Sequence, residues 1–319
     1  MERKQIRALG RRVKKIFIEH DEVKRIWSRF DGMRTYIKLD QFEDEDEEEN
    51  DDDDKRNLFL TGLSGVGKSQ IGKRYAKSVP RYTEIIDDEE IDIIPVIYVE
   101  LPYPFTQAEF YKEILKALGT ENFKKEPTVN ELRNRVFHLL TKQRVEMIIF
   151  DEMNFIMRTK NFDNQSAMEM LKKLSNQLQL CIVCMGTPQI EKLHTMEDEY
   201  VRRFGRDRIE RFEKCDEKFC ELLERIEKAI ESPNPIGLHD QSTGLPQLLH
   251  YYCQGRIGYL HLILKESFRL LNVYEENVQV EYSEIRLTVD IIKQAKFNLF
   301  RKNDHLITPD NVDKKEYMV

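Results

Sequence analysis

The sequence has no apolar run near the roughly 18 residues that a membrane-spanning helix needs. It begins MERKQIRALGRRVKKIF, which contains neither a long hydrophobic stretch nor the small-residue cleavage site of a secretory leader. Cysteine is also scarce, and five thiols in 319 residues do not make a disulfide framework. We therefore expect a protein of the reducing cytoplasm without a membrane partner.

Metal-binding patterns are missing as well. The seven histidines are scattered, and no pair has the spacing of a metal site. Cys181 and Cys184 form a C-x-x-C pattern, but side chains three apart on a strand point to opposite faces. We therefore do not expect a zinc or redox centre there.

Charge is abundant and unevenly distributed. Residues 43–54 (EDEDEEENDDDD) hold eleven acidic groups, and without them the net charge of −7 would become +4. The first 40 residues hold twelve Lys and Arg against six Asp and Glu. A like-charged run is typical of a solvated loop, although a regulatory or DNA-mimicking role stays open.

Strands and helices alternate through the middle of the chain. Apolar spacing predicts helix over residues 1–40, and from about 57 to 205 short apolar strands alternate with amphipathic helices. Thr106, Thr128 and Ser166 each begin a capping-box pattern. Such alternation indicates an α/β domain with a parallel sheet and right-handed crossovers. The expected strands are 57–61, 95–101, 147–150 and 181–185.

The remainder of the chain changes character. From about residue 212, apolar stripes at helical spacing predict a smaller all-α domain. The expected divisions are an N-terminal helical segment (1–42), an acidic loop (43–56), the α/β domain (57–211), the helical domain (212–303) and a polar tail (304–319).

The strongest motif is GLSGVGKS at 62–69, a G-x-x-x-x-G-K-[ST] pattern between a predicted strand and a predicted helix. Its glycines allow successive N–H groups to point at a phosphate, and the helix N-terminus adds positive charge. Lys68 would reach the β- and γ-phosphates, and the Ser69 hydroxyl would bind Mg²⁺. The expected ATP-binding residues are Gly62, Ser64, Gly65, Val66, Gly67, Lys68, Ser69 and Gln70.

Two further strand ends carry polar residues. An apolar strand ends in Asp151 and Glu152, where Asp151 would hold the Mg²⁺ shell and Glu152 would orient and deprotonate the attacking water. Thr187 follows the strand CIVCMG and would position that water. The alternative for Thr187 is an ordinary Gly-Thr-Pro turn.

Arginines near the end of each domain are candidates for nucleotide contacts. Arg202, Arg203 or Arg206 would act as a finger that reaches the γ-phosphate in a neighbouring subunit. A basic surface is the alternative, and the spacing does not choose among the three. Arg256 stands at the start of a predicted helix, where it would contact the nucleotide from the second domain or lie on the surface.

Several basic positions are candidates for contacts to DNA phosphates, which need no base-reading element. Taken singly, each of these residues fits a solvated surface charge better than a DNA contact. The candidates are Lys124, Lys125, Arg158 and Lys160, together with an N-terminal cluster of Arg11, Arg12, Lys14 and Lys15.

In their order, GLSGVGKS, IIFDE and VCMGTP resemble the Walker A, Walker B and sensor-1 segments of AAA+ ATPases. VIYVELPYPFTQAEFYKEILKALG, YVRRFGRDRIERF and GRIGYLHLILKESFRLL resemble further elements of the TniB/TnsC transposition regulators, which are similar to IstB. The resemblance covers roughly residues 15–300. It implies a P-loop αβα sandwich with a parallel sheet and a small C-terminal helical lid domain.

The resemblance also implies a function. Such a protein binds ATP with Mg²⁺, assembles as a ring or helical filament on duplex DNA of any sequence, and recruits a DDE transposase. A TniQ/TnsD-like protein would nucleate the assembly, and ATP hydrolysis would dissolve it. The acidic run and the short chain depart from the family pattern and leave the partner contacts open. An Orc-like or helicase-loader ATPase, and an ATP-driven protein-binding switch without DNA dependence, are the alternatives.

Overall fold

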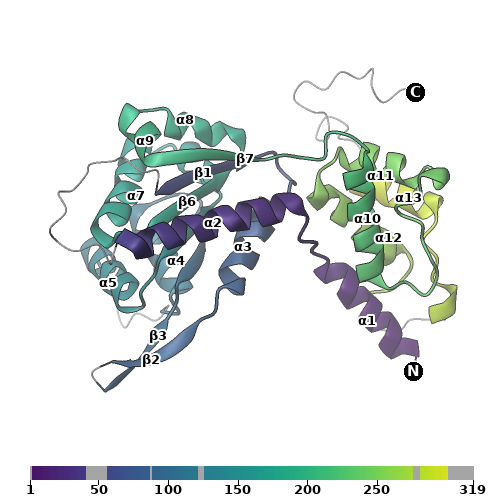
Figure 1. Cartoon of the computed structure of the whole chain (residues 1–319), viewed down its shortest axis with the longest axis horizontal. Helices are drawn as coiled ribbons and strands as arrows, with labels where there is room; N and C mark the ends of the chain where they lie inside the picture. Colours follow the sequence, from purple (N-terminus) through teal and green to yellow (C-terminus); the bar gives the residue numbers. More distant parts are fainter. Residues whose placement is uncertain (1, 41–55, 87, 121–125, 276–280, 301–319) are drawn as a thin grey trace. The chain divides into compact units, whose positions relative to one another are not determined.

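The structure, a computed structural model, describes residues 2–40, 56–86, 88–120, 126–275 and 281–300 (Figure 1). The chain divides into two units. Glu22–Ser64 and Lys68–Ile209 form what we name the α/β unit. Met1–Asp21, Gly65–Gly67 and Glu210–Val319 form the helical unit. The acidic run and the polar tail lie outside the described residues.

Five parallel strands form the sheet of the α/β unit, in the order β4-β5-β6-β1-β7. They are β1 (Asn57–Gly62), β4 (Val96–Glu100), β5 (Met147–Asp151), β6 (Cys181–Gly186) and β7 (Phe204–Ile209). Every residue of β1, β5 and β6 is buried, as in strands covered on both faces. The expected fold class is thus confirmed, and each of the four predicted strands ends within one residue of its predicted bounds.

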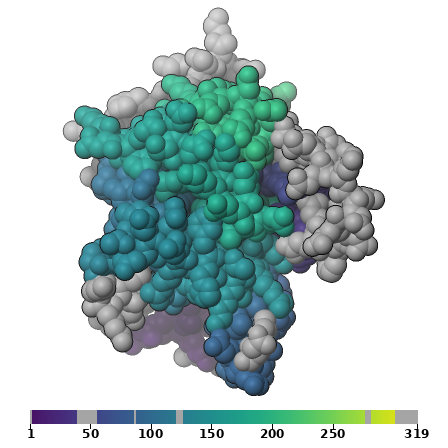
Figure 2. Space-filling model, turned by 90° about the vertical axis from the view of Figure 1, so that its left-hand side faces the viewer, coloured from purple at the N-terminus to yellow at the C-terminus, as the bar shows by residue number. Residues whose placement is uncertain are grey.

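Strand β7 and a hairpin are not predicted by the sequence analysis. Strand β7 lies at the edge of the sheet beside β1, and its sequence FGRDRI is too charged to show an apolar run. The hairpin consists of β2 (Tyr82–Ile86) and β3 (Glu89–Ile93) and extends away from the sheet in Figure 1. It forms the blue projection at the lower end of the face shown in Figure 2. Because both segments are short and rich in exposed polar residues, neither has the periodicity of a core strand.

Helices cover both faces of this sheet. One face, which carries Phe59 and Phe150, packs against α4, α5 and α7. The other face packs against α3, where a Cβ on Gly72 would come 2.7 Å from the Met185 side chain. Helix α2 packs on α3, and its Trp27 indole donates a hydrogen bond to the Ile71 carbonyl (3.2 Å). The helices of this unit are α2 (Asp21–Asp40), α3 (Lys68–Ser78), α4 (Gln107–Ala117), α5 (Val129–Lys142), α6 (Asn154–Arg158), α7 (Asn164–Leu178), α8 (Glu191–His194) and α9 (Asp198–Arg203).

The helix starts show which capping residues act. Thr106 and Thr128 accept hydrogen bonds from the N–H groups three residues on, and Thr128 forms the complete capping box. The third predicted box is wrong, because Asp163 caps α7 and Ser166 lies inside the helix. Both the N–H and the hydroxyl of Ser166 donate to the Asp163 carboxylate (2.8 and 3.0 Å). A carboxylate is a stronger acceptor than a hydroxyl and prevails as the cap.

The helical unit has a core of its own, formed by α10 (Glu217–Ile230), α11 (Leu245–Cys253), α12 (Ile257–Leu270) and α13 (Val289–Leu299). Helix α1 (Glu2–Lys15) packs into this core as well. The predicted helical stretch 1–40 is therefore two helices, α1 and α2, which belong to different units. Each apolar stripe is buried in a different core.

No helix in the described part of the chain has both the length and the apolar character that a membrane crossing requires. All five cysteines are free thiols. Cys181 and Cys184 are buried in β6, and burial raises the pKa of the Cys181 thiol to about 12. Both are therefore inert core residues at neutral pH.

Candidate nucleotide-binding and hydrolysis site

The site lies at the carboxyl ends of three neighbouring strands. Strands β5, β6 and β1 are adjacent and parallel, so the segments that follow them meet at one edge of the sheet. These segments are the phosphate loop after β1, Asp151 and Glu152 at the end of β5, and Thr187 after β6. In open α/β sheets this is the edge where ligands bind.

The loop between β1 and α3 has the backbone that a phosphate group requires. Gly65 and Gly67 have φ values of 84° and 103°. A Cβ on Gly67 would meet no atom within 4 Å, so the backbone conformation is what requires glycine there. Lys68 begins α3, and its ammonium donates to the carbonyl oxygens of Gly62 (2.7 Å) and Leu63 (3.0 Å). The backbone N–H groups of this loop and the Lys68 ammonium together form a set of hydrogen-bond donors that fits a polyphosphate.

The other predicted loop positions differ in exposure. Val66 is buried, whereas Ser64 and Gln70 are exposed. Ser69, the second residue of α3, is half-buried, and its hydroxyl lies close enough to the Tyr98 phenol to lower the pKa of that phenol.

Asp151 is the last residue of β5 and is only 2% exposed. Its carboxylate accepts hydrogen bonds from the Tyr98 phenol (2.5 Å) and from the Glu152 N–H (2.8 Å). Burial first, and then the charge of Asp151, hold the pKa of Tyr98 well above its usual value, so the phenol stays a donor. Tyr98 thus orients Asp151, which together with the nearby Ser69 offers oxygen atoms that fit a Mg²⁺ ion.

Glu152 has a strained backbone and a perturbed carboxyl group. Its φ value is 59°, an uncommon conformation for a residue other than glycine. Burial, and next the charge of Asp151, raise the pKa of Glu152, while the Lys68 ammonium acts in the opposite direction. A carboxylate with a raised pKa is a stronger proton acceptor, which is the property that a general base needs.

Thr187 is held by a reciprocal pair of hydrogen bonds. The Asn154 side-chain amide donates to the Thr187 hydroxyl (2.7 Å) and accepts from the Thr187 N–H (2.9 Å). Asn154 itself is 2% exposed and begins α6. The pair fixes both the backbone and the side chain of Thr187.

Tyr98 and Asn154 are the residues of this site that the sequence analysis missed. Asn154 is a polar residue in the otherwise apolar segment MNFIM, three positions after Asp151. Tyr98 places a polar group inside the apolar strand VIYVE. Both signals are weak alone, because buried polar groups in a core usually serve only their own hydrogen bonds.

The three candidate finger arginines have different environments. Arg203, the last residue of α9, donates to the Glu199 carboxylate (3.0 Å) and to the Asn176 amide oxygen (2.8 Å). Arg202 is exposed on the same helix. Arg206 is exposed on β7 and makes no ion pair with any described residue. Within one chain, then, Arg203 is bound to neighbouring side chains, whereas Arg206 is exposed and has no ion-pair partner among the described residues.

Arg256 lies in the helical unit, where it is the residue before α12 and is 6% exposed. Its guanidinium lies over the Tyr259 ring, 5.4 Å from the ring centroid. A surface position, one of the two sequence-based alternatives, is therefore wrong for Arg256.

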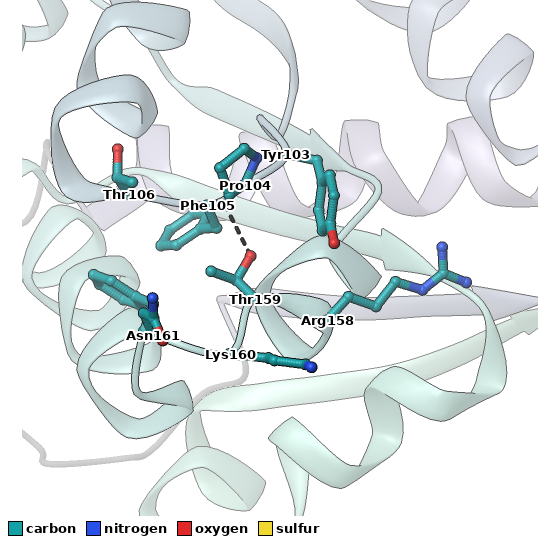
Figure 3. A pocket seen from close by; sticks show the side chains of 9 residues that line it. Tyr103, Pro104, Phe105, Thr106, Arg158, Thr159, Lys160 and Asn161 are labelled. Carbon is teal, nitrogen blue, oxygen red and sulfur yellow. Dashed lines mark hydrogen bonds between the residues drawn. The ribbon is translucent and has the colours of Figure 1, made fainter.

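Two of the four candidate DNA-binding residues line a pocket of about 380 Å³ (Figure 3). Arg158 is the last residue of α6, Lys160 lies just after it, and Tyr103 comes from the loop after β4. The two loops are joined by a hydrogen bond from the Phe105 N–H to the Thr159 hydroxyl (2.9 Å). Tyr103 is 63% exposed, and Figure 3 shows it beside Arg158. Lys124 and Lys125 lie outside the described residues.

The comparisons with known proteins agree with this geometry. The family model of the bacterial TniB protein matches residues 21–214. No curated protein matches the sequence.

Solved structures with a similar fold include the ORC1 protein of Aeropyrum pernix in complex with DNA. The TM-score is 0.53 and the identity 16%, and the match covers 77% of this chain and 60% of that chain. The Walker-type ATPase of Pyrococcus abyssi gives a TM-score of 0.55 at 13% identity, covering 92% and 74%. The chain thus spans less than two thirds of the ORC1 protein, and at these identities the likeness concerns the fold alone.

Proposed function

Because the chain belongs to the TniB family of bacterial proteins and is an AAA+ ATPase, we propose that it regulates DNA transposition by assembling on target DNA. The ATP-bound chain coats duplex DNA irrespective of sequence, and the assembly recruits and activates a DDE transposase. A TniQ/TnsD-like protein nucleates the assembly. The observation that carries the proposal is the meeting of the phosphate loop, Asp151, Glu152 and Thr187 at one sheet edge in a chain of this family.

Each residue of the site has a separate task in hydrolysis. The N–H groups of the phosphate loop and Lys68 bind the β- and γ-phosphates. Ser69 and Asp151 would hold Mg²⁺, which supplies charge neutralisation of the phosphates when bound. Glu152 accepts a proton from the attacking water, and Thr187, fixed by Asn154, orients that water.

The arginines extend the site to a second subunit. A finger in trans must point out of its own subunit, and this requirement favours Arg206 over Arg203, which is bound to Glu199. Arg256 remains a candidate for a further nucleotide contact. ATP is then bound by parts of two chains, so that assembly and hydrolysis depend on each other.

The loops of the Figure 3 pocket are the first DNA-contacting surface. Arg158 and Lys160 bind phosphate oxygens, and the exposed Tyr103 packs against the sugar-phosphate chain beside them. None of these side chains needs to read a base, which agrees with sequence-independent binding.

Electron microscopy of the protein with duplex DNA, with and without a non-hydrolysable ATP analogue, tests the proposal. Rings or filaments on DNA only with the analogue are expected, and Arg158→Ala with Lys160→Ala should reduce them. Monomers under every condition would contradict it and favour a protein-binding switch.

A replication-type ATPase is the second candidate, because the A. pernix ORC1 protein to which the chain is similar was solved in complex with DNA. Both candidates share every nucleotide-binding residue. Stimulation of ATP turnover separates them: a transposase should stimulate this chain under the first proposal, and a replicative helicase under the second.

A further inference from the structure

Helix α1 carries a row of positive charge that the nucleotide site does not use. Its 14 residues, ERKQIRALGRRVKK, contain seven Lys and Arg and a single acidic residue, Glu2. At 3.6 residues per turn, six of these seven cations fall within an arc of about 120° on the helix surface. The six, which we name the α1 row, are Arg3, Lys4, Arg7, Arg11, Lys14 and Lys15.

The opposite side of α1 fixes the orientation of the row. Its buried residues are Ile6, Leu9, Gly10 and Val13, which pack into the core of the helical unit. Arg12, the seventh cation, is turned away from the row: its guanidinium donates to the Ile230 carbonyl (2.8 Å) and pairs with the Glu231 carboxylate (3.4 Å). The His261 ring contacts the Val13 carbonyl (2.9 Å). The helix is thus anchored along its length, and the row faces outward.

The four N-terminal charges of the row are not neutralised by the described residues around it. All six side chains are exposed, and Arg3, Lys4, Arg7 and Arg11 form no ion pair with any residue that the structure describes. Lys14 lies over the Tyr274 ring at 4.6 Å from the centroid, which leaves its positive charge in place. Like charges held this close repel one another, and a polyanion would relieve that repulsion.

We propose that the α1 row is a second phosphate-binding surface, which contacts the backbone of the duplex DNA on which the chain assembles. This inference rests on the proposed DNA binding and adds the helical unit to it. Arg3, Arg7 and Arg11 stand on successive turns about 6 Å apart, so they span about 12 Å of a rigid helix. A DNA strand places a phosphate every 3.4 Å or so along its axis and can engage all three. An anionic membrane is a poorer fit, because the apolar face that a surface helix would bury in lipid is already packed in protein.

Binding of a labelled 40-base-pair duplex, followed by fluorescence anisotropy with a non-hydrolysable ATP analogue at several salt concentrations, tests the inference. The test variant is R3E/R7E/R11E. The matched control is K24E/K77E/K173E, which makes the same charge change at exposed lysines of the α/β unit. The slope of log affinity against log salt should fall by about 3 in the test variant, since each phosphate contact contributes about 0.9. The slope for the control variant should fall by less than 1.

The remaining outcomes are separable. One outcome would overturn the role of the α1 row and leave the proposed function in place. In that outcome the wild type binds DNA, Arg158→Ala weakens this binding, and the test and control variants have equal salt slopes. No DNA binding by the wild type in any nucleotide state would overturn both. The inference would also be overturned, in favour of membrane binding, by another result. In that result the wild type and the control bind phosphatidylserine vesicles, and the test variant loses this binding but keeps its DNA binding. A second variant, R3Q/R7Q/R11Q, and equal thermal melting of all variants exclude misfolding as the cause.

Discussion

The Tyr98 phenol donates a 2.5 Å hydrogen bond to the Asp151 carboxylate, so one side chain of β4 orients the acidic residue at the end of β5. The two strands are paired in register, with Tyr98 opposite Ile149 and Glu100 opposite Asp151. The phenol therefore leans along its strand to reach a carboxylate two positions further on. Groups that orient metal-binding residues in this way commonly matter nearly as much as the residues themselves.

Tyr98→Phe should weaken the response of the ATPase to Mg²⁺ by about 10-fold or more, because Asp151 loses the phenol that orients its carboxylate. The aromatic ring stays buried, so the protein should still fold. Steady-state ATP turnover measured against Mg²⁺ concentration checks this. Tyr111→Phe is the matched control, since it removes a hydroxyl from another buried tyrosine of the α/β unit. Identical Mg²⁺ curves for the two variants would refute the role of Tyr98.

Glu152→Gln should reduce ATP turnover by about 100-fold or more while ATP still binds, because the amide cannot accept the proton. Lys68→Ala should lose binding itself. Assemblies of the Glu152 variant on DNA should then persist in ATP as the wild type does only in the non-hydrolysable analogue. Normal ATP turnover in the Glu152→Gln variant would contradict the assignment of Glu152 as the general base.

The same Glu152→Gln substitution should raise the melting temperature at neutral pH. Burial and the charge of Asp151 raise the pKa of Glu152 in the folded chain, so the ionised form of Glu152 opposes folding. The folded chain is therefore more stable while Glu152 is protonated, and this stability is lost as the pH rises through the folded-state pKa. Below the unfolded pKa both states are protonated and the advantage of glutamine disappears. Melting curves from pH 4 to pH 8 test this, and an advantage that is constant with pH would contradict it.

Asn154→Ala should lower the turnover number more than it changes the KM for ATP, because Thr187 orients water and does not bind nucleotide. It should also cost about 1–3 kcal/mol of stability, since the Thr187 N–H loses its partner in a buried region. The aspartate of Asn154→Asp still accepts a hydrogen bond from the Thr187 N–H, so this variant should recover part of the turnover number and part of the stability. Turnover that falls equally in the two variants, with equal loss of stability, would show that Asn154 has no positioning role.

Gly255→Ala should destabilise the helical unit and displace Arg256. An added Cβ would lie 1.8 Å from the Phe212 carbonyl oxygen, and Gly255 also has a φ value of 67°. Gly244 is the matched control, because its φ value is similar at 69° but a Cβ there would meet nothing within 4 Å. Gly244→Ala should cost about 1–2 kcal/mol from backbone strain alone. Thermal or urea unfolding should show a clearly larger loss for Gly255→Ala, and equal losses would refute the close contact.

The catalytic centre could be predicted in part because its chemistry leaves local patterns. A phosphate loop needs glycine at fixed positions followed by Lys68, and an apolar strand that ends in Asp151 and Glu152 is visible in a few residues. Tyr98 and Asn154 leave no such pattern. Their roles depend on strand pairing and on a side chain reaching across to another segment, which no spacing along the chain records.

The amino-acid sequence by itself determined the type of fold, the buried strands and the phosphate loop, since these depend on local periodicity and on short-range backbone chemistry. Only the tertiary structure decided that α1 and α2 belong to different units, that β7 is a strand, and that Arg203 is bound within its own chain. It also decided that Arg12 donates to the Ile230 carbonyl and that the α1 row is exposed to solvent. The reason is physical: burial and ion pairing are properties of neighbours in space, and an isolated helix pattern does not specify which core will cover it.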